Sequence, residues 1–164
     1  MTTSAYPESA AIRARLLADH HRDLDRQFEE LVTRARAGDG GDLRCEWIAF
    51  ERELLRHLDV EEAEILPGFA QHDPGGAQAI LADHAAIRRE VLEMGMSLDL
   101  HLVRAEAIEG FVRRLKEHAR REEMTLYEWA GPHVEPARWR SIGRHLIDLA
   151  QDRRPTTPKG FPGR

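Results

Sequence analysis

The chain has 164 residues, of which 41% are hydrophobic and 32% are charged, and its formal net charge is −5 at pH 7. This length and composition fit one domain with a sizeable core. Acidic and basic residues are interspersed without a basic stripe between aromatic residues, which argues against nucleic-acid binding. One cysteine, Cys45, excludes an intramolecular disulfide. We see no signal peptide and no apolar run of the roughly 20 residues that span a membrane, so we expect a cytoplasmic protein that does not cross a membrane.

The first two predicted elements are long helices, because Ala, Leu, Glu and Arg dominate the sequence. The first runs from about residue 8 to 36 and ends in the glycine-rich turn 38–42. Asp42 is a candidate N-cap of the second helix, which extends to about Ala70. A Pro-Gly pair at 67–68 disturbs its last turn, since proline cannot donate the backbone hydrogen bond of a helix.

Two further helices follow the sequence Asp-Pro-Gly-Gly at 73–76, a strong helix breaker. We expect the third helix to end within 94–97, where Gly95 interrupts or stops it. Asp99 is a candidate cap of the fourth helix, which continues to about Ala130 and stops at the Gly-Pro pair that follows. Short connections favour an all-α, antiparallel four-helix bundle of up-down-up-down topology.

A fifth, shorter helix is predicted at 136–152. Its apolar stripe consists of Trp139, Ile142, Leu146 and Leu149. Packing of this stripe on the bundle is the favoured interpretation, and contact with a second copy of the chain or with a partner protein is the alternative. Residues 1–152 are therefore assigned to the bundle and its C-terminal helix, and 153–164, rich in Pro and Gly, to a disordered tail.

Each half of the chain carries the same pattern of histidine and glutamate. An isolated histidine on one helix is followed on the next helix by a histidine and, four residues later, by a glutamate. The residues are His21, His57 and Glu61 in the first half and His84, His118 and Glu122 in the second. Residues four apart share a helix face, so four helices would turn imidazoles inward and two would add a carboxylate. Such a set is typical of a pair of iron ions or of similar divalent metals.

The apolar register strengthens this interpretation. The stripes comprise Trp47, Phe50, Leu54, Ile65 and Phe69 on the second helix, and Ile108, Phe111, Leu115, Leu126 and Trp129 on the fourth. Each His-x-x-x-Glu pair fills the gap in its stripe, so both glutamates would face the core. A buried carboxylate is unfavourable unless it is neutralised, paired or metal-bound, and bound metal explains both glutamates. A buried hydrogen-bonded pair without metal is the alternative.

Two adjacent histidines compete for the first position. His21 and His84 have the same offsets from the apolar residues of their helices, which favours His21. The tetrapeptide LADH occurs at both 17–20 and 81–84, and it would pair His20 with His84 instead. We therefore keep His20 as an alternative or an addition to His21.

The remaining polar and aromatic residues nearby are assigned no role in metal binding. The histidines expected at the surface or in structural positions are His72, His101, His133 and His145. The acidic residues that point off the core register, toward solvent, are Glu62, Glu64 and Glu123, and Asp25 is left out for the same reason. The residues assigned to packing are Met94, Met96, Tyr127 and Trp129. For Tyr127 and Trp129, the alternative is that they line a pocket.

The chain resembles the hemerythrin-like family, the HHE cation-binding domain, in the segments DHHRDLDRQFEEL, HLDVEEAEILP, LADHAAIRREV and HARREEM. The resemblance extends over about residues 17–130. It implies an up-down four-helix bundle around a non-heme di-iron centre. Glu61 and Glu122 would bridge two Fe ions, the four histidines would be terminal ligands, and an oxo, hydroxo or water bridge would complete the centre. Ferritin-like di-iron proteins carry Glu-x-x-His instead.

The sequence departs from the oxygen-carrying hemerythrins at two positions. Arg88 stands where those proteins have a further histidine, and Glu122 follows His118 by four residues where they have an aspartate after five. Fewer protein ligands leave open positions on a metal, where substrates bind. The leading function is binding or sensing of oxygen or a related small ligand. The alternatives are an enzyme acting on peroxide or nitric oxide, and iron handling, so the sequence leaves the enzyme question open.

Overall fold

The computed structural model describes residues 10–37, 40–100, 102 and 105–152. These residues form seven helices and no strand, which confirms the expected all-α class. The helices are α1 (Ala10–Ala37), α2 (Gly40–Glu64), α3 (Leu66–His72), α4 (Pro74–Asp99), α5 (Ala105–Met124), α6 (Leu126–His133) and α7 (Pro136–Asp152). The predicted tail 153–164, His101 and the first residues of the predicted first helix lie outside the described residues. Within the described segments, none of the helices has the length and apolar character needed to span a membrane.

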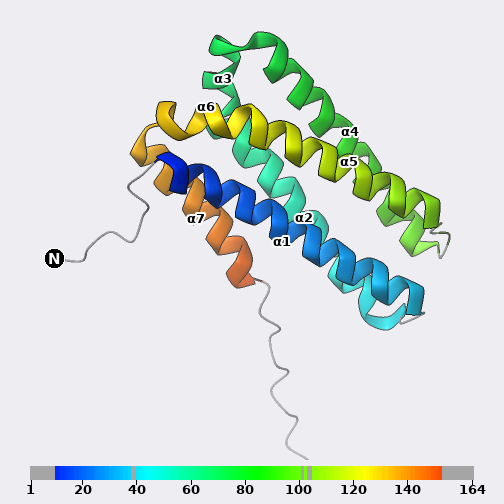
Figure 1. Ribbon diagram of the computed structural model, residues 1–164. Coiled ribbons are helices and arrows are strands. Elements are labelled where there is room, and N and C mark those ends of the chain that lie inside the picture. Colours follow the sequence, from blue (N-terminus) through cyan, green and yellow to red (C-terminus); the bar gives the residue numbers. More distant parts are fainter. Residues whose placement is uncertain (1–9, 38–39, 101, 103–104, 153–164) are drawn as a thin grey trace, which may run out of the picture.

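The four long helices lie side by side as a bundle (Figure 1). Helix α1 contacts α2 and α5, and α4 contacts the same two helices, so the four enclose a common core. The short helices α3 and α6 lie together at one end of the bundle. Helix α7 packs beside α1 and α2, where Trp139, Ile142 and Leu146 are buried. These three residues of the predicted apolar stripe therefore cover the bundle itself, and the side chain of the fourth, Leu149, lies outside the described part of the structure.

The core consists of two apolar clusters with a polar layer between them. Along α1, Leu17 belongs to one cluster and Leu24, two turns later, to the other. Along α4, Ile80 and Ile87 are divided in the same way. The histidines and glutamates singled out in the sequence occupy the layer in between, so apolar side chains separate them from solvent at both ends.

The second predicted helix is broken in the structure. We expected it to continue to Ala70, but α2 ends at Glu64 and α3 begins at Leu66. Pro67 lies in the first turn of α3. The backbone N–H groups of a first turn have no hydrogen-bond partner within the helix, so the N–H that proline lacks does not destabilise α3. The predicted breaker at 73–76 does separate two helices, but its last three residues form the first turn of α4.

The end of α4 and the course of α5 also differ from expectation. Helix α4 continues past Gly95 to Asp99, so the predicted interruption was wrong, and Asp99 ends α4 instead of capping α5. A Cβ at Gly95 would lie 3.1 Å from Nε1 of Trp47, so this glycine allows close packing of α4 on α2. The predicted fourth helix is divided at Thr125, and α6 runs through Pro132 instead of stopping before it.

Candidate metal centre

The polar layer gathers side chains from the four long helices into one buried cluster. It contains His20 and His21 from α1, His57 and Glu61 from α2, His84 from α4, and His118 and Glu122 from α5. None of these residues is more than 7% exposed. Charged and polar groups this deep in a core need partners, because an unpaired buried charge is strongly unfavourable.

Two groups of side chains in the described part of the chain are arranged to hold a metal ion. The first group comprises His21, His57, Glu61 and Glu122. Nε2 of His57 lies 2.9 Å from Nε2 of His21 and 3.2 Å from Oε1 of Glu61. Nε2 of His21 lies 3.2 Å from Oε2 of Glu122. Two imidazole nitrogens and two carboxylate oxygens therefore converge.

The second group comprises Glu61, His84, His118 and Glu122. Nε2 of His84 lies 3.0 Å from Oε1 of Glu122 and 3.5 Å from Oε2 of Glu61. Nε2 of His118 lies 3.2 Å from Oε2 of Glu122. Both glutamates belong to both groups, and Glu61 turns Oε1 to His57 and Oε2 to His84. This is the placement that a pair of bridging carboxylates would need.

Several buried atoms of the cluster make no hydrogen bond in the part of the chain that the structure describes, and two of them belong to the atoms that converge in the second group. Nε2 of His118 and Oε2 of Glu61 are buried, and neither makes a hydrogen bond within the described residues. Buried polar atoms without partners are rare and cost roughly 1–3 kcal/mol each. A divalent cation bound by both groups would satisfy these two atoms, and imidazole with carboxylate suits iron, zinc and manganese. The residues present therefore fit a metal site.

Two of the histidines would be positively charged in metal-free protein. Burial lowers the pKa of His21, but its contacts with Glu122 and Glu123 raise it to about 10. Burial also lowers the pKa of His84, and its contacts with Glu122 and Glu61 raise it to about 10. At neutral pH each of these imidazoles holds a proton that a metal ion would have to displace.

The other two histidines of the metal-binding groups, His57 and His118, would be neutral in metal-free protein. Burial lowers the pKa of His57 to about 4 although the charge of Glu61 acts in the opposite direction. Burial lowers the pKa of His118 to about 3, and nearby histidines add to this effect. For Glu61, burial raises the pKa but the neighbouring histidines lower it well below its usual value. For Glu122, burial and the charge of Glu61 raise the pKa.

Each histidine of the two metal-binding groups has a second ring nitrogen, Nδ1, which does not face the converging atoms. This nitrogen lies near another polar side chain. The pairs of atoms are His57 Nδ1 and His20 Nδ1 at 2.9 Å, His84 Nδ1 and Glu62 Oε1 at 2.8 Å, His21 Nδ1 and Glu123 Oε1 at 3.6 Å, and His118 Nδ1 and Asp83 Oδ2 at 3.8 Å. The first two pairs are hydrogen-bonded, and such outer partners commonly fix the tautomer and orientation of metal-binding histidines, whereas Nδ1 of His21 and Nδ1 of His118 make no hydrogen bond among the described residues.

The structure places His20 and His21 differently. His21 lies within the first group, whereas His20 is buried behind His57 and belongs to neither group. Nε2 of His20 lies 3.1 Å from Oε1 of Glu53. A row of side chains therefore leads from Glu53 through His20 to His57, so the geometry favours His20 as a support for His57.

Some contacts of the cluster were not expected from the sequence. Glu62 was placed on the solvent side, but it is only 32% exposed and contacts both His84 and Arg88. Arg88 pairs with Glu62 and, at 2.8 Å, with Asp59, so its side chain is held outside the cluster. The need of each imidazole for an outer partner was the signal that could have indicated Glu62, immediately after Glu61.

Tyr127 was assigned to packing, with the lining of a pocket as the alternative, and the structure places it beside the cluster. Its ring is buried, as expected of a residue that packs in the core. Its hydroxyl, however, lies within the first group, 3.1 Å from Nε2 of His21 and 3.3 Å from Oε2 of Glu122. The break at Thr125 shifts the register of the helix that follows. A stripe extrapolated along one continuous helix therefore could not place this side chain.

Other histidines lie apart from the cluster. His72 and His133 are exposed, as expected, and both contact the ring of Trp129, with ring centroids 6.3 and 5.1 Å away. His145 is half-buried on α7. None of the three belongs to either metal-binding group.

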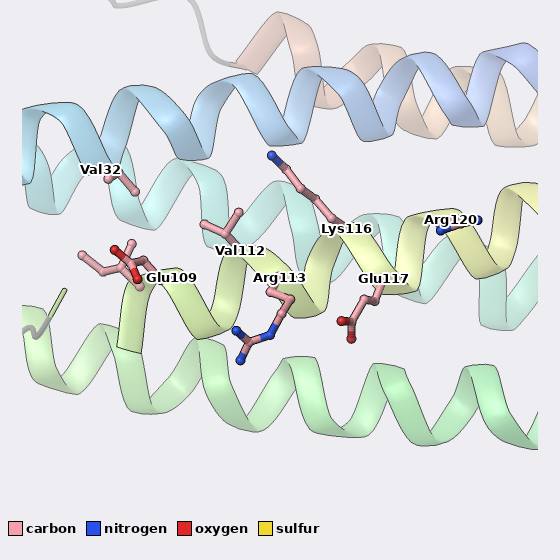
Figure 2. Close-up of a pocket in the computed structure, with 8 residues that line it drawn as sticks. Val32, Glu109, Val112, Arg113, Lys116, Glu117 and Arg120 are labelled. Carbon is pink, nitrogen blue, oxygen red and sulfur yellow. The ribbon is translucent and has the colours of Figure 1, made fainter. Parts of the chain in front are cut away.

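A surface pocket of about 470 Å³ also lies outside the metal cluster. It extends around α5, with Lys116 reaching toward α1 and with Arg113 and Glu117 on the side of α4 (Figure 2). None of its lining residues belongs to either metal-binding group; they are Val32, Ile108, Glu109, Val112, Arg113, Lys116, Glu117 and Arg120. The candidate site is therefore the enclosed polar layer and not this pocket.

Comparison with known proteins assigns the chain to a family. Residues 13–130 match the hemerythrin HHE cation-binding domain, so the chain belongs to the hemerythrin HHE family. This confirms the resemblance noted in the sequence, and all residues of both metal-binding groups lie within the matched span. No curated protein and no solved structure gave a significant match.

Proposed function

We propose that the polar layer binds two iron ions. His21 and His57 would bind the first ion, His84 and His118 the second, and Glu61 and Glu122 would bridge the two. An oxo, hydroxo or water bridge would complete the centre. The observation that carries this proposal is that both buried glutamates belong to both groups of converging side chains.

We propose further that this centre binds or senses oxygen or a related small ligand. A bound iron pair would supply reversible electron transfer and open coordination positions for such a ligand. The histidines and glutamates would hold the ions, and the apolar clusters on both sides would exclude bulk water. Glu62 and His20 would orient His84 and His57 through the ring nitrogens that face away from the cluster.

An enzyme that acts on peroxide or nitric oxide is the second candidate. Arg88 favours it, because this residue stands where the oxygen carriers have a further histidine and its guanidinium instead pairs with Glu62 and Asp59. The second ion would then have a position free for substrate. Iron handling is a third alternative. Peroxide turnover that is lost in a His118→Ala variant would favour the enzyme, and slow autoxidation of a stable oxygen adduct would favour the binding protein.

The up-down-up-down topology and the cytoplasmic location are also parts of this proposal. Consecutive long helices contact each other, and the connection at Asp73 between α3 and α4 is a single residue, which supports antiparallel neighbours.

The experiment that tests the proposal is the metal content and optical spectrum of iron-loaded protein. We expect two irons per chain and near-ultraviolet bands that disappear on reduction and return in air. Glu61→Gln and His57→Ala should lose metal, whereas the matched exposed variant His72→Ala should keep both ions. Retention of two ions in both cluster variants, or two metals with no change on reduction, would contradict the proposal.

A further inference from the structure

The hydroxyl of Tyr127 lies against the first metal-binding group. Its oxygen is 3.1 Å from Nε2 of His21 and 3.4 Å from Nε2 of His57. It is 3.3 Å from Oε2 of Glu122, and it donates a hydrogen bond to Oε1 of Glu61. The phenol oxygen is thus close to one ligand atom of every member of the first group.

Most separations between these five atoms are those expected of ligands around one ion. His21 Nε2 lies 2.9 Å from His57 Nε2 and 3.2 Å from Glu122 Oε2, and His57 Nε2 lies 3.2 Å from Glu61 Oε1. The oxygen of Tyr127 lies 3.1, 3.4 and 3.3 Å from the atoms of His21, His57 and Glu122, and it is hydrogen-bonded to that of Glu61. Adjacent ligands of one octahedral ion with bonds of about 2.1 Å lie about 3 Å apart, close to these six distances.

Hydrogen bonding alone leaves part of this arrangement unexplained. A phenol has one proton, which Tyr127 gives to Glu61. Its hydroxyl therefore cannot donate to Oε2 of Glu122 at the same time, although the two oxygens lie 3.3 Å apart in a core where Tyr127 is 2% exposed. A cation bound by the phenol oxygen and both carboxylates would satisfy all of these contacts together.

We propose that Tyr127 is a fifth protein ligand of the ion bound by His21 and His57. This inference rests on the proposed function, and it adds a ligand of a different chemical class, an anionic phenolate oxygen. On binding, the phenol O–H bond breaks, the proton is released to solvent, and the oxygen binds the ion. Phenolate is a hard oxygen donor, so the site would favour a ferric ion.

The proposal makes the two metal positions unequal. The first ion has five protein ligands, and the second, held by Glu61, His84, His118 and Glu122, has four. No contact joins Tyr127 to His84 or His118 among the hydrogen bonds of the described residues. A small ligand would therefore bind at the second ion, on the side of α4 and α5.

The test uses Tyr6→Phe protein, because Tyr6 is the only other tyrosine of the chain and lies outside the described residues. With Tyr127 as its sole tyrosine, this variant loaded with ferric iron should show the visible charge-transfer band of an iron phenolate. Loading with gallium, which is redox-silent, should give the ultraviolet difference band of ionised phenol. Tyr127→Phe, which keeps the buried ring, should lose both bands.

The outcomes separate this inference from the proposed function. Two irons per chain without either phenolate band would overturn the role of Tyr127 and leave the di-iron site in place. Bands that persist in Tyr127→Phe would also overturn it. Absence of metal binding by the unmodified protein would overturn both. If Tyr127→Phe fails to fold, the spectra of Tyr6→Phe decide the question alone.

Discussion

In metal-free protein, the four histidines of the two groups should make their joint contribution to the free energy of unfolding greatest near pH 6.5. On the alkaline side the responsible groups are His21 and His84, whose pKa is about 10 in the folded chain against 6.5 for an unperturbed histidine. Their contribution to stability is present below pH 6.5 and is lost as the pH rises toward 10, because only the folded protein holds these protons. Within that window each group changes the free energy of unfolding by up to about 1.4 kcal/mol per pH unit.

On the acid side the sign reverses. His57 and His118 have pKa values of about 4 and about 3 in the folded chain, so below pH 6.5 the unfolded chain takes up these protons first. The free energy of unfolding therefore falls as the pH decreases from 6.5 toward 4. Glu61 adds to the loss below its ordinary pKa of 4.5, because its pKa is lowered in the folded protein.

Denaturant unfolding of chelator-treated protein, followed by circular dichroism on both sides of pH 6.5, measures this curve. His21→Asn should make the alkaline limb shallower, whereas His72→Asn, a matched change at an exposed histidine, should leave it unchanged. A stability that increases steadily from pH 6.5 to 9 in metal-free protein would refute the electrostatic reasoning.

Three further predictions concern single contacts. His20→Ala should weaken metal binding by about 10- to 100-fold, because His57 loses its support. Competition with a chelator measures the affinity, and His133→Ala is the control. Equal affinities of the two variants would show that His20 has no such role. Metal binding at pH 7 should release protons from the buried imidazoles whose pKa is about 10. The calorimetric binding enthalpy should therefore depend on the ionisation enthalpy of the buffer, and this dependence should be smaller in His84→Ala. A binding enthalpy that is the same in all buffers would contradict the prediction. Asp73→Ala removes the carboxylate oxygen that lies 2.9 Å from the backbone nitrogen of Gly76 and caps α4. It should lower the free energy of unfolding, measured by denaturant titration, by about 1 kcal/mol. An unchanged unfolding midpoint would show that this cap is not needed.

The sequence was informative wherever a helical repeat faced the core. Residues such as Phe50, Leu54, Ile80 and Ile87 are buried as their spacing predicted, because burial of an apolar face depends on local periodicity. The same register indicated that the glutamate at 61 and its counterpart in the second half would face inward, and both are fully buried.

The features that sequence reasoning missed depend on breaks and on contacts between helices. The ends of α2 and α5, at Glu64 and Met124, interrupt patterns that read as continuous, because tertiary packing at the end of the bundle outweighs local propensity there. The break before α6 brings Tyr127 to the cluster. Glu62 and Arg88 meet across α2 and α4, and nothing in the spacing along either helix encodes that pairing.

The most direct test of the central claim is anomalous diffraction at the iron edge from crystals of the iron-loaded protein. Two peaks are expected in the polar layer, one between His21 and His57 and one between His84 and His118, with Glu61 and Glu122 contacting both. A single peak, or peaks bound by other residues, would contradict it.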